Sequence, residues 1–106
     1  MDIRPALTQA SEMQKRMLRL QEELGRLEVS HSVAGGMVTV TMSGHKRVLA
    51  LKIDPETLDG DVEMTEDMVL AAFNGAAEKV DDLVGRRTED IMAEFPLAAD
   101  LQPPLA

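Results

Sequence analysis

Residues 37–55, MVTVTMSGHKRVLALKIDP, carry the clearest structural pattern of this chain. Residues 37–43 and residues 49–53 alternate apolar and polar side chains, which is typical of half-buried strands. Ser43-Gly44-His45 interrupts the alternation, and Gly44 is expected to supply the backbone dihedral angles of a tight turn. The stretch therefore predicts an antiparallel hairpin that ends at Asp54-Pro55.

A third strand and a covering helix are expected around this hairpin. Residues 28–34 alternate in the same way, and Ala34-Gly35-Gly36 is expected to turn the chain into the hairpin. Two strands alone are marginal in water, so their apolar face needs a cover. From residue 62 onward apolar positions recur at helical spacing, which predicts a helix on that face with Phe73 in the core and the small Gly75 at a close approach. The predicted fold class is α+β in the order α-β-β-β-α, with a three-stranded antiparallel sheet and two long helices.

The first helix is predicted over residues 5–28 and carries an apolar seam. Apolar residues recur there at alternating spacings of three and four from Ile3 to Leu27, as in helices that pack along other helices. The helix would be about 36 Å long, which exceeds what the small sheet can cover. Part of the seam is therefore expected to pack on the C-terminal helix or on a partner's helix, and we expect a homodimer. The predicted core or dimer contacts are Met13, Met17, Leu20, Leu24, Leu27 and Phe73.

The chain of 106 residues is predicted to form one domain over residues 1–96. Pro96 is expected to end the last helix, and residues 97–106 are interpreted as a tail that need not be ordered. The chain has no cysteine, which excludes disulfides and zinc–thiolate sites. No apolar run is as long as a membrane span, and no secretory signal is recognised, so a cytoplasmic protein without membrane contact is expected.

No catalytic or metal-binding pattern is recognised in the sequence. It lacks a Ser-His-Asp spacing, a Gly-rich phosphate loop and an HExxH motif. The acidic segment 54–61 fails the calcium-binding EF-hand template, because Asp59 stands where glycine is required. His31 and His45 have no third ligand at a recognisable spacing. The sequence therefore predicts a protein that is not an enzyme and uses no metal, cofactor or small-molecule substrate.

The net charge of −8 is distributed unevenly. Residues 29–53 carry three basic residues and no acidic one, whereas residues 54–106 carry fourteen acidic and three basic residues. Binding to phosphate depends on local positive potential, so only the first half could present a surface for nucleic acid. With two Phe and no Tyr or Trp, stacking of unpaired bases on aromatic side chains is nearly excluded.

Charged residues form a stripe on the first helix opposite the seam: Glu12, Lys15, Arg19, Glu22 and Arg26. Two interpretations of this stripe stay open. One is a solvated face with local ion pairs, such as Glu12–Arg16 and Glu22–Arg26. The other is a row of contacts to phosphate groups. The basic Lys46 and Arg47 after the Gly44 turn have the same two interpretations, a protected strand edge or a phosphate contact.

Several short motifs follow one another between residues 36 and 80. They are Gly36 before Val38-Thr39-Val40, the Gly44 turn, Ile53-Asp54-Pro55, Met64-Thr65-Glu66-Asp67-Met68 and Ala72-Phe73-Asn74-Gly75-Ala76. In this order and at this spacing they resemble the YbaB/EbfC nucleoid-associated proteins of bacteria. The Met-, Gln- and Glu-rich first helix and the chain length are similar too, so the resemblance covers nearly the whole chain.

The resemblance implies a tweezer-like homodimer that binds double-stranded DNA in the nucleoid, with a role in nucleoid organisation or gene regulation. In similar proteins the two long helices are implicated in DNA contact. The basic residues that these helices carry here are Lys15, Arg16, Arg19, Arg26, Arg86 and Arg87. The contacts would be mainly to phosphate, because no helix-turn-helix or zinc finger indicates base readout. The alternative is an acidic, dimeric adaptor that binds other proteins and has little or no affinity for DNA.

Overall fold

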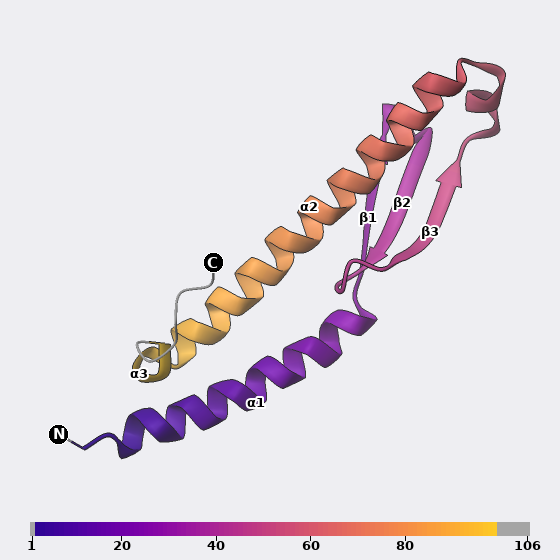
Figure 1. Ribbon diagram of the computed structural model, residues 1–106. Coiled ribbons are helices and arrows are strands. Elements are labelled where there is room, and N and C mark those ends of the chain that lie inside the picture. Colours follow the sequence, from indigo (N-terminus) through magenta and orange to yellow (C-terminus); the bar gives the residue numbers. More distant parts are fainter. Residues whose placement is uncertain (1, 100–106) are drawn as a thin grey trace.

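The structure, a computed structural model, describes residues 2–99 and confirms the predicted α-β-β-β-α order. Helix α1 (Arg4–Arg26) leads into the strands β1 (Glu28–Val33), β2 (Val38–Ser43) and β3 (Val48–Ile53), and the long helix α2 (Val62–Glu94) follows. Short helical turns cover Ala34–Gly36 and Pro55–Asp59, and a short helix, α3 (Pro96–Ala99), ends the described chain. The molecule is elongated, at 70 × 23 × 16 Å, because both long helices extend past the sheet (Figure 1).

The three strands form an antiparallel sheet in the order β1-β2-β3. Val40 of the central strand lies opposite His31 on one side and Leu51 on the other. Because neighbouring side chains of a strand point to opposite faces, the even-numbered residues of β2 share one face. They are all buried, and with Ala72, Ala76 and Val80 of α2 they form the first core cluster: Val38, Val40 and Met42.

Helix α2 covers β1 and β2 but leaves most of β3 uncovered: this strand lies at the far edge of the sheet (Figure 1), and only its last residue, Ile53, packs against the first cluster. Leu51 shares the face of Val40 but remains 49% exposed. Phe73 was expected in the core, and this is wrong for the single chain, because Phe73 is 42% exposed and lies outside both core clusters. The helix presents its small residues Ala72 and Ala76 to the sheet. Phe73 follows Ala72 in the helix and therefore points in a different direction around the helix axis.

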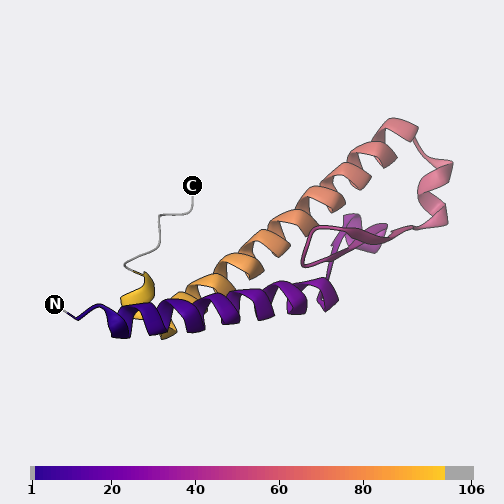
Figure 2. The same ribbon diagram turned by 60° about the horizontal axis from the view of Figure 1, so that its bottom comes forward.

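A second cluster joins α1 to the C-terminal half of α2 and to α3 (Figure 2). Met13, Leu20 and Leu24 are buried in it, while Met17 and Leu27 pack at its border. The apolar seam of α1 is thus covered within the same chain by the C-terminal helices, which was one of the two partners expected for it.

The two hairpin turns use glycine in different ways. Gly35 and Gly36 both adopt positive φ angles, of 67° and 93°, which glycine reaches without steric cost. Gly44 was expected to do the same, and this is wrong: the positive φ in the second turn, 63°, belongs to Lys46. Gly44 is needed for space, because a Cβ atom there would lie 2.5 Å from the backbone oxygen of Leu24.

The close approach expected at Gly75 is confirmed. The imidazole of His31 on β1 lies directly over it, since a Cβ atom at position 75 would fall 2.2 Å from the ring. The buried Nδ1 of His31 has no hydrogen-bond partner among the described residues. Any larger residue at position 75 would have to displace the His31 ring or push α2 away from β1.

Helix α2 begins at a capped N-terminus and ends before the predicted stop at Pro96. The Asp61 carboxylate accepts a hydrogen bond from the Glu63 backbone N–H at 3.0 Å, which satisfies one of the free donors of the first turn. After α2, the start of the expected tail forms α3. There the Leu97 backbone N–H donates to Gln9 Oε1 at 3.1 Å, and Ala98 is buried in the second cluster. Residues 100–106 of the expected tail lie outside the described residues.

Candidate nucleic-acid interface

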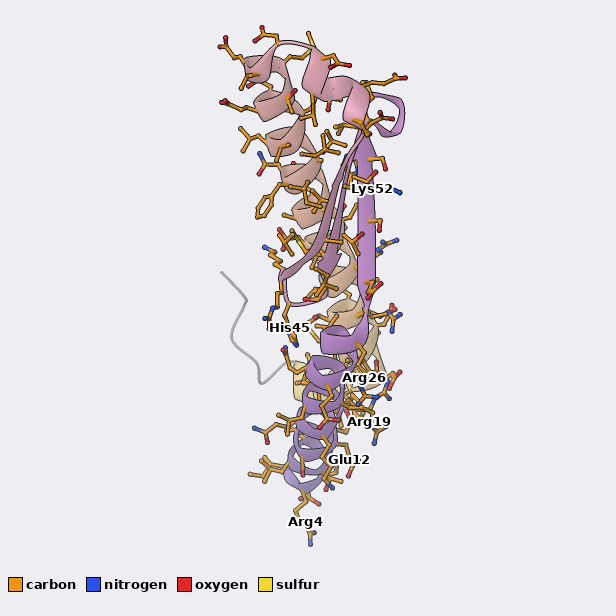
Figure 3. All side chains as sticks on the ribbon, turned by 90° about the vertical axis from the view of Figure 1, so that its right-hand side faces the viewer. Arg4, Glu12, Arg19, Arg26, His45 and Lys52 are labelled. Carbon is orange, nitrogen blue, oxygen red and sulfur yellow. The ribbon has the colours of Figure 1, made fainter. Side chains whose placement is uncertain are left out.

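Four of the six basic residues predicted to contact DNA lie on α1. Arg19 and Arg26 are seven residues apart, which places them on one side of the helix about 10 Å from each other. Figure 3 shows Glu12, Arg19 and Arg26 following one another along α1. The helical spacing of the sequence therefore produces the expected charged stripe, with Arg26 at the end of α1 that adjoins the sheet.

A cleft of about 300 Å³ between α1 and α2 brings three of the predicted residues together. Arg16 and Arg19 line it from α1 and Arg87 lines it from α2. Leu20 and Ile91 of the second cluster also line the cleft. Three carboxylates share the same cleft, so it has no excess of positive charge: Glu23, Asp90 and Glu94.

Ion pairs occupy several of these basic side chains. Arg16 pairs with Glu94 across the cleft through both terminal nitrogens, one of them 3.4 Å from Glu94 Oε1. Arg87 Nη1 is 3.9 Å from a carboxylate oxygen of Glu23. These pairs are partly exposed, so each stabilises the fold by only about 0–1 kcal/mol. Phosphate could therefore replace a carboxylate partner at low cost in stability.

The local ion pairs expected on α1 are not the observed ones. Glu12 was expected to pair with Arg16, and this is wrong: Lys15 Nζ is 3.5 Å from Glu12 Oε1, whereas Arg16 reaches α2. The expected Glu22–Arg26 pair is not found within residues 2–99. Arg19 and Arg26 accordingly have no ion-pair partner in the described part of the chain.

Arg86 lies apart from the other predicted residues. Its Nε donates a hydrogen bond to the backbone oxygen of Asp82 at 3.3 Å. It lines a separate hollow with Asp81, Asp82 and Glu89, and it does not line the cleft that contains Arg87. Successive residues of a helix point about 100° apart, which is why adjacent arginines reach different surfaces.

The acidic segment 54–67 lies at the far end of the molecule from α1. It forms the turn after β3 and the start of α2, beyond the tips of the strands (Figure 1). Its carboxylates are thus well separated from the basic stripe. Within the described residues no group of three His, Asp or Glu side chains is arranged to hold a metal ion.

An exposed apolar surface was not predicted from the sequence. A hollow of about 710 Å³ at the start of α2 is lined by Leu58, Val62, Val69, Leu70 and Phe73. Leu49 and Leu51 of β3 are also half exposed. Monomeric proteins rarely expose large contiguous apolar patches. The alternating pattern of β3 indicated one apolar face, but nothing in the sequence indicates that α2 stops short of that strand.

Comparison with known proteins supports the resemblance seen in the motifs. The family model described as the YbaB/EbfC DNA-binding family matches residues 1–95. This chain belongs to the YbaB/EbfC family. A protein of Brucella ovis named a nucleoid-associated protein is 39% identical over 97 residues, which cover 91% of each chain. One of Xanthomonas campestris with the same description is 48% identical over 80 residues, covering 76% of this chain and 74% of that one.

A solved structure supports the fold of this YbaB/EbfC member. The crystal structure of an uncharacterized protein, HP0035, from Helicobacter pylori matches with a TM-score of 0.70 at 23% identity. The match covers 77% of this chain and 87% of the other. The family is one of DNA-binding proteins and not a family of enzymes. None of the helices within residues 2–99 combines the length and the apolar composition that a membrane crossing requires.

Proposed function

We propose that this protein binds double-stranded DNA in the bacterial nucleoid as a homodimer, mainly through contacts to phosphate, and serves nucleoid organisation or gene regulation. The observation that carries the proposal is the match of residues 1–95 to a DNA-binding family whose relatives are named nucleoid-associated proteins. The basic stripe on α1 supplies the chemistry that such binding needs.

Arginine is suited to this contact because its planar guanidinium donates two parallel hydrogen bonds to one phosphate. Arg19 and Arg26 can bind without giving up a partner in the described chain, whereas Arg16, Arg87 and Lys15 must exchange a carboxylate for phosphate. Contacts of this kind carry little sequence information. Binding should therefore be weak, sensitive to salt and only modestly selective.

A second copy of the chain is the proposed cover for the apolar surface at β3 and the start of α2. This surface combines Leu51 of the sheet with Val62, Leu70 and Phe73 of the helix. Its burial against an identical surface would remove the unfavourable contact of apolar side chains with water. The α1 helices would extend from such a common body as the arms of a tweezer. Each basic position would then occur twice.

The DNA proposal is tested by titrating duplex DNA with the protein at several salt concentrations. The wild-type chain should lose affinity as salt rises, because phosphate contacts release counterions. Replacing Arg16 and Arg19 by Ala should weaken binding to unrelated duplexes alike and reduce the salt slope by roughly one unit for each phosphate that is no longer bound. Arg86→Ala is the control, since Arg86 lies outside the cleft, and the free energy of binding that it loses should be less than half of the loss in the double variant, which removes two charges.

Absence of binding by the wild-type protein at low salt would refute the DNA proposal. In that case the acidic adaptor becomes the better explanation, and a partner protein should be sought. The double variant removes two charges and Arg86→Ala removes one, so a free-energy loss for Arg86→Ala that is half that of the double variant or more would show that net charge alone, and not the stripe, governs binding.

The dimer is tested by light scattering at micromolar protein concentration. The wild-type protein should have twice the chain mass of 11.6 kDa. Phe73→Glu should shift the mass toward the monomer, because it places a charge in the proposed apolar interface. Leu18→Glu is the control, since Leu18 is 64% exposed on α1 and lies outside the patch. A monomeric wild-type protein, or a dimer unchanged by Phe73→Glu, would contradict this interface.

A further inference from the structure

The face of the sheet turned away from α2 consists of small polar side chains, one lysine near one end and one glutamate near the other. In each strand these are the residues between those that point to α2. The register places Ser30 beside Thr41, Ser32 beside Thr39, and Thr39 beside Lys52. We call this surface the outer face, and it comprises Glu28, Ser30, Ser32, Thr39, Thr41, Ala50 and Lys52.

The hydroxyl groups of the outer face are joined in two cross-strand pairs. Ser30 Oγ lies 2.9 Å from Thr41 Oγ1, and Ser32 Oγ lies 2.7 Å from Thr39 Oγ1. A hydroxyl has a single hydrogen to donate, so each pair uses one hydrogen internally and leaves the other free to donate outward. The pairs are two residues apart, or about 7 Å along the strand. The face therefore offers two fixed, regularly spaced donors to an acceptor-rich partner.

Positive charge flanks these hydroxyls at both ends. Lys52 lies beside Thr39 at one end, and Arg26 lies at the end of α1 that leads into β1. In Figure 3, Lys52 lies on the side of the sheet away from α2, with Arg26 and Arg19 below it on the same side of the molecule. None of these three side chains has an ion-pair partner within residues 2–99. Glu28 lies on the outer face itself, between Arg26 and Ser30 along the chain, so the positive charge at that end comes from the arginines of α1.

The composition of the outer face also indicates what kind of partner it does not fit. Its largest apolar residue is Ala50, whereas protein interfaces are centred on buried aromatic and large side chains. It has no aromatic residue on which an unpaired base could stack. Hydroxyl, lysine and arginine donors are the groups that proteins use to contact the phosphates and sugars of nucleic acids.

We infer that the outer face, together with Arg26 and Arg19, is a contact surface for the phosphate backbone of duplex DNA. The inference rests on the proposed function and adds to it a surface on the sheet that lies outside the two long helices. Lys52 and the arginines supply the ionic contacts, and the two hydroxyl pairs donate neutral hydrogen bonds between them. DNA would thus lie along one side of α1 and continue across the sheet.

Charged and neutral contacts can be separated by the salt dependence of DNA binding. Lys52→Ala should weaken binding about tenfold at low salt and reduce the salt slope by about 0.9 for each phosphate that the protein no longer neutralises. The double variant Ser32→Ala/Thr39→Val should weaken binding and leave the slope unchanged, because a neutral donor releases no counterion. Lys46→Ala is the control: Lys46 Nζ is 2.6 Å from Asp81 Oδ1, off the outer face, and this variant should bind as the wild type does.

Circular dichroism should show that all variants remain folded. In NMR spectra of the ¹⁵N-labelled protein, the chemical shifts of backbone amides in β1 and β2 should change when a short DNA duplex is added. The inference is overturned if Lys52→Ala and Ser32→Ala/Thr39→Val bind as tightly as the wild type while the Arg16 and Arg19 double variant binds less tightly. That result would leave the proposed function intact. If the wild-type chain binds no DNA at low salt, the proposed function and this inference both fail.

Discussion

Substitution of Gly44 by Ala should be the most damaging single-methyl change at the junction between α1 and the sheet. The added Cβ atom would lie 2.5 Å from the Leu24 oxygen and 2.8 Å from Leu24 Cα. Both atoms belong to the backbone of a helix whose neighbouring side chains are buried, so neither can rotate away. Either the turn after β2 or the end of α1 must move.

The magnitude follows from two contributions. Overpacking of a well-packed site costs about 1–3 kcal/mol. The Gly44 backbone N–H also donates to the carbonyl oxygens of Leu24, at 2.9 Å, and Leu27, at 3.2 Å. These are carbonyls at the C-terminal end of α1, and loss of such a hydrogen bond costs about 0.5–1.5 kcal/mol. The expected loss of stability is therefore about 2–4 kcal/mol.

Urea unfolding followed by circular dichroism measures this loss, with all proteins at one concentration because dimerisation contributes to stability. Gly85→Ala is the matched control. Gly85 lies within α2, and a Cβ atom there would meet nothing within 4 Å. It should raise stability by up to about 1 kcal/mol, since Ala favours the helix over Gly. A Gly44→Ala protein within about 0.5 kcal/mol of the wild type, which is the usual range for surface changes, would refute this account of the junction.

Two further changes test the packing of α2. Gly75→Ala should destabilise the protein by about 1–3 kcal/mol through its clash with the His31 ring. His31→Ala should remove that clash, so the double variant His31→Ala/Gly75→Ala should have a higher melting temperature than His31→Ala alone. Asp61→Ala should lower the free energy of unfolding by about 1 kcal/mol, because it removes the helix N-cap, whereas Asp61→Asn should retain most of the stability. If denaturant unfolding shows equal losses of stability for both variants, the capping hydrogen bond does not stabilise the helix.

Part of the candidate interface could be predicted from sequence, because it depends on position along one helix. The 3.6-residue period is enough to place Arg19 and Arg26 on a common side of α1. The separation of Arg86 from Arg87 follows from the same period, but which of the two meets α1 depends on how the helices pack. The ion pairs of Arg16 and Arg87 with Glu94 and Glu23 join residues more than sixty positions apart, and no local pattern indicates them.

In the outer face, too, some features follow from local sequence patterns and others depend on how the strands pair. Alternation in residues 28–33 and 38–43 already separates two faces of the sheet. The pairing of Ser30 with Thr41 and of Ser32 with Thr39 depends on the register, which the turn at residues 34–36 sets. The proximity of Lys52 to this face depends on the further pairing of β3 with β2.

The helices and strands could be predicted from the sequence because their signals are local: alternation for the strands, apolar spacing for the helices and Asp-Pro or Gly for the ends. The partner of each apolar surface, in contrast, is known only from the packing of the folded chain. Most of the seam of α1, from Ala10 to Leu27, packs on α2 and α3, while Phe73 and Leu51 are left half exposed. The physical reason is that hydrophobic attraction is non-directional, so a pattern shows that a surface should be buried but not which partner buries it.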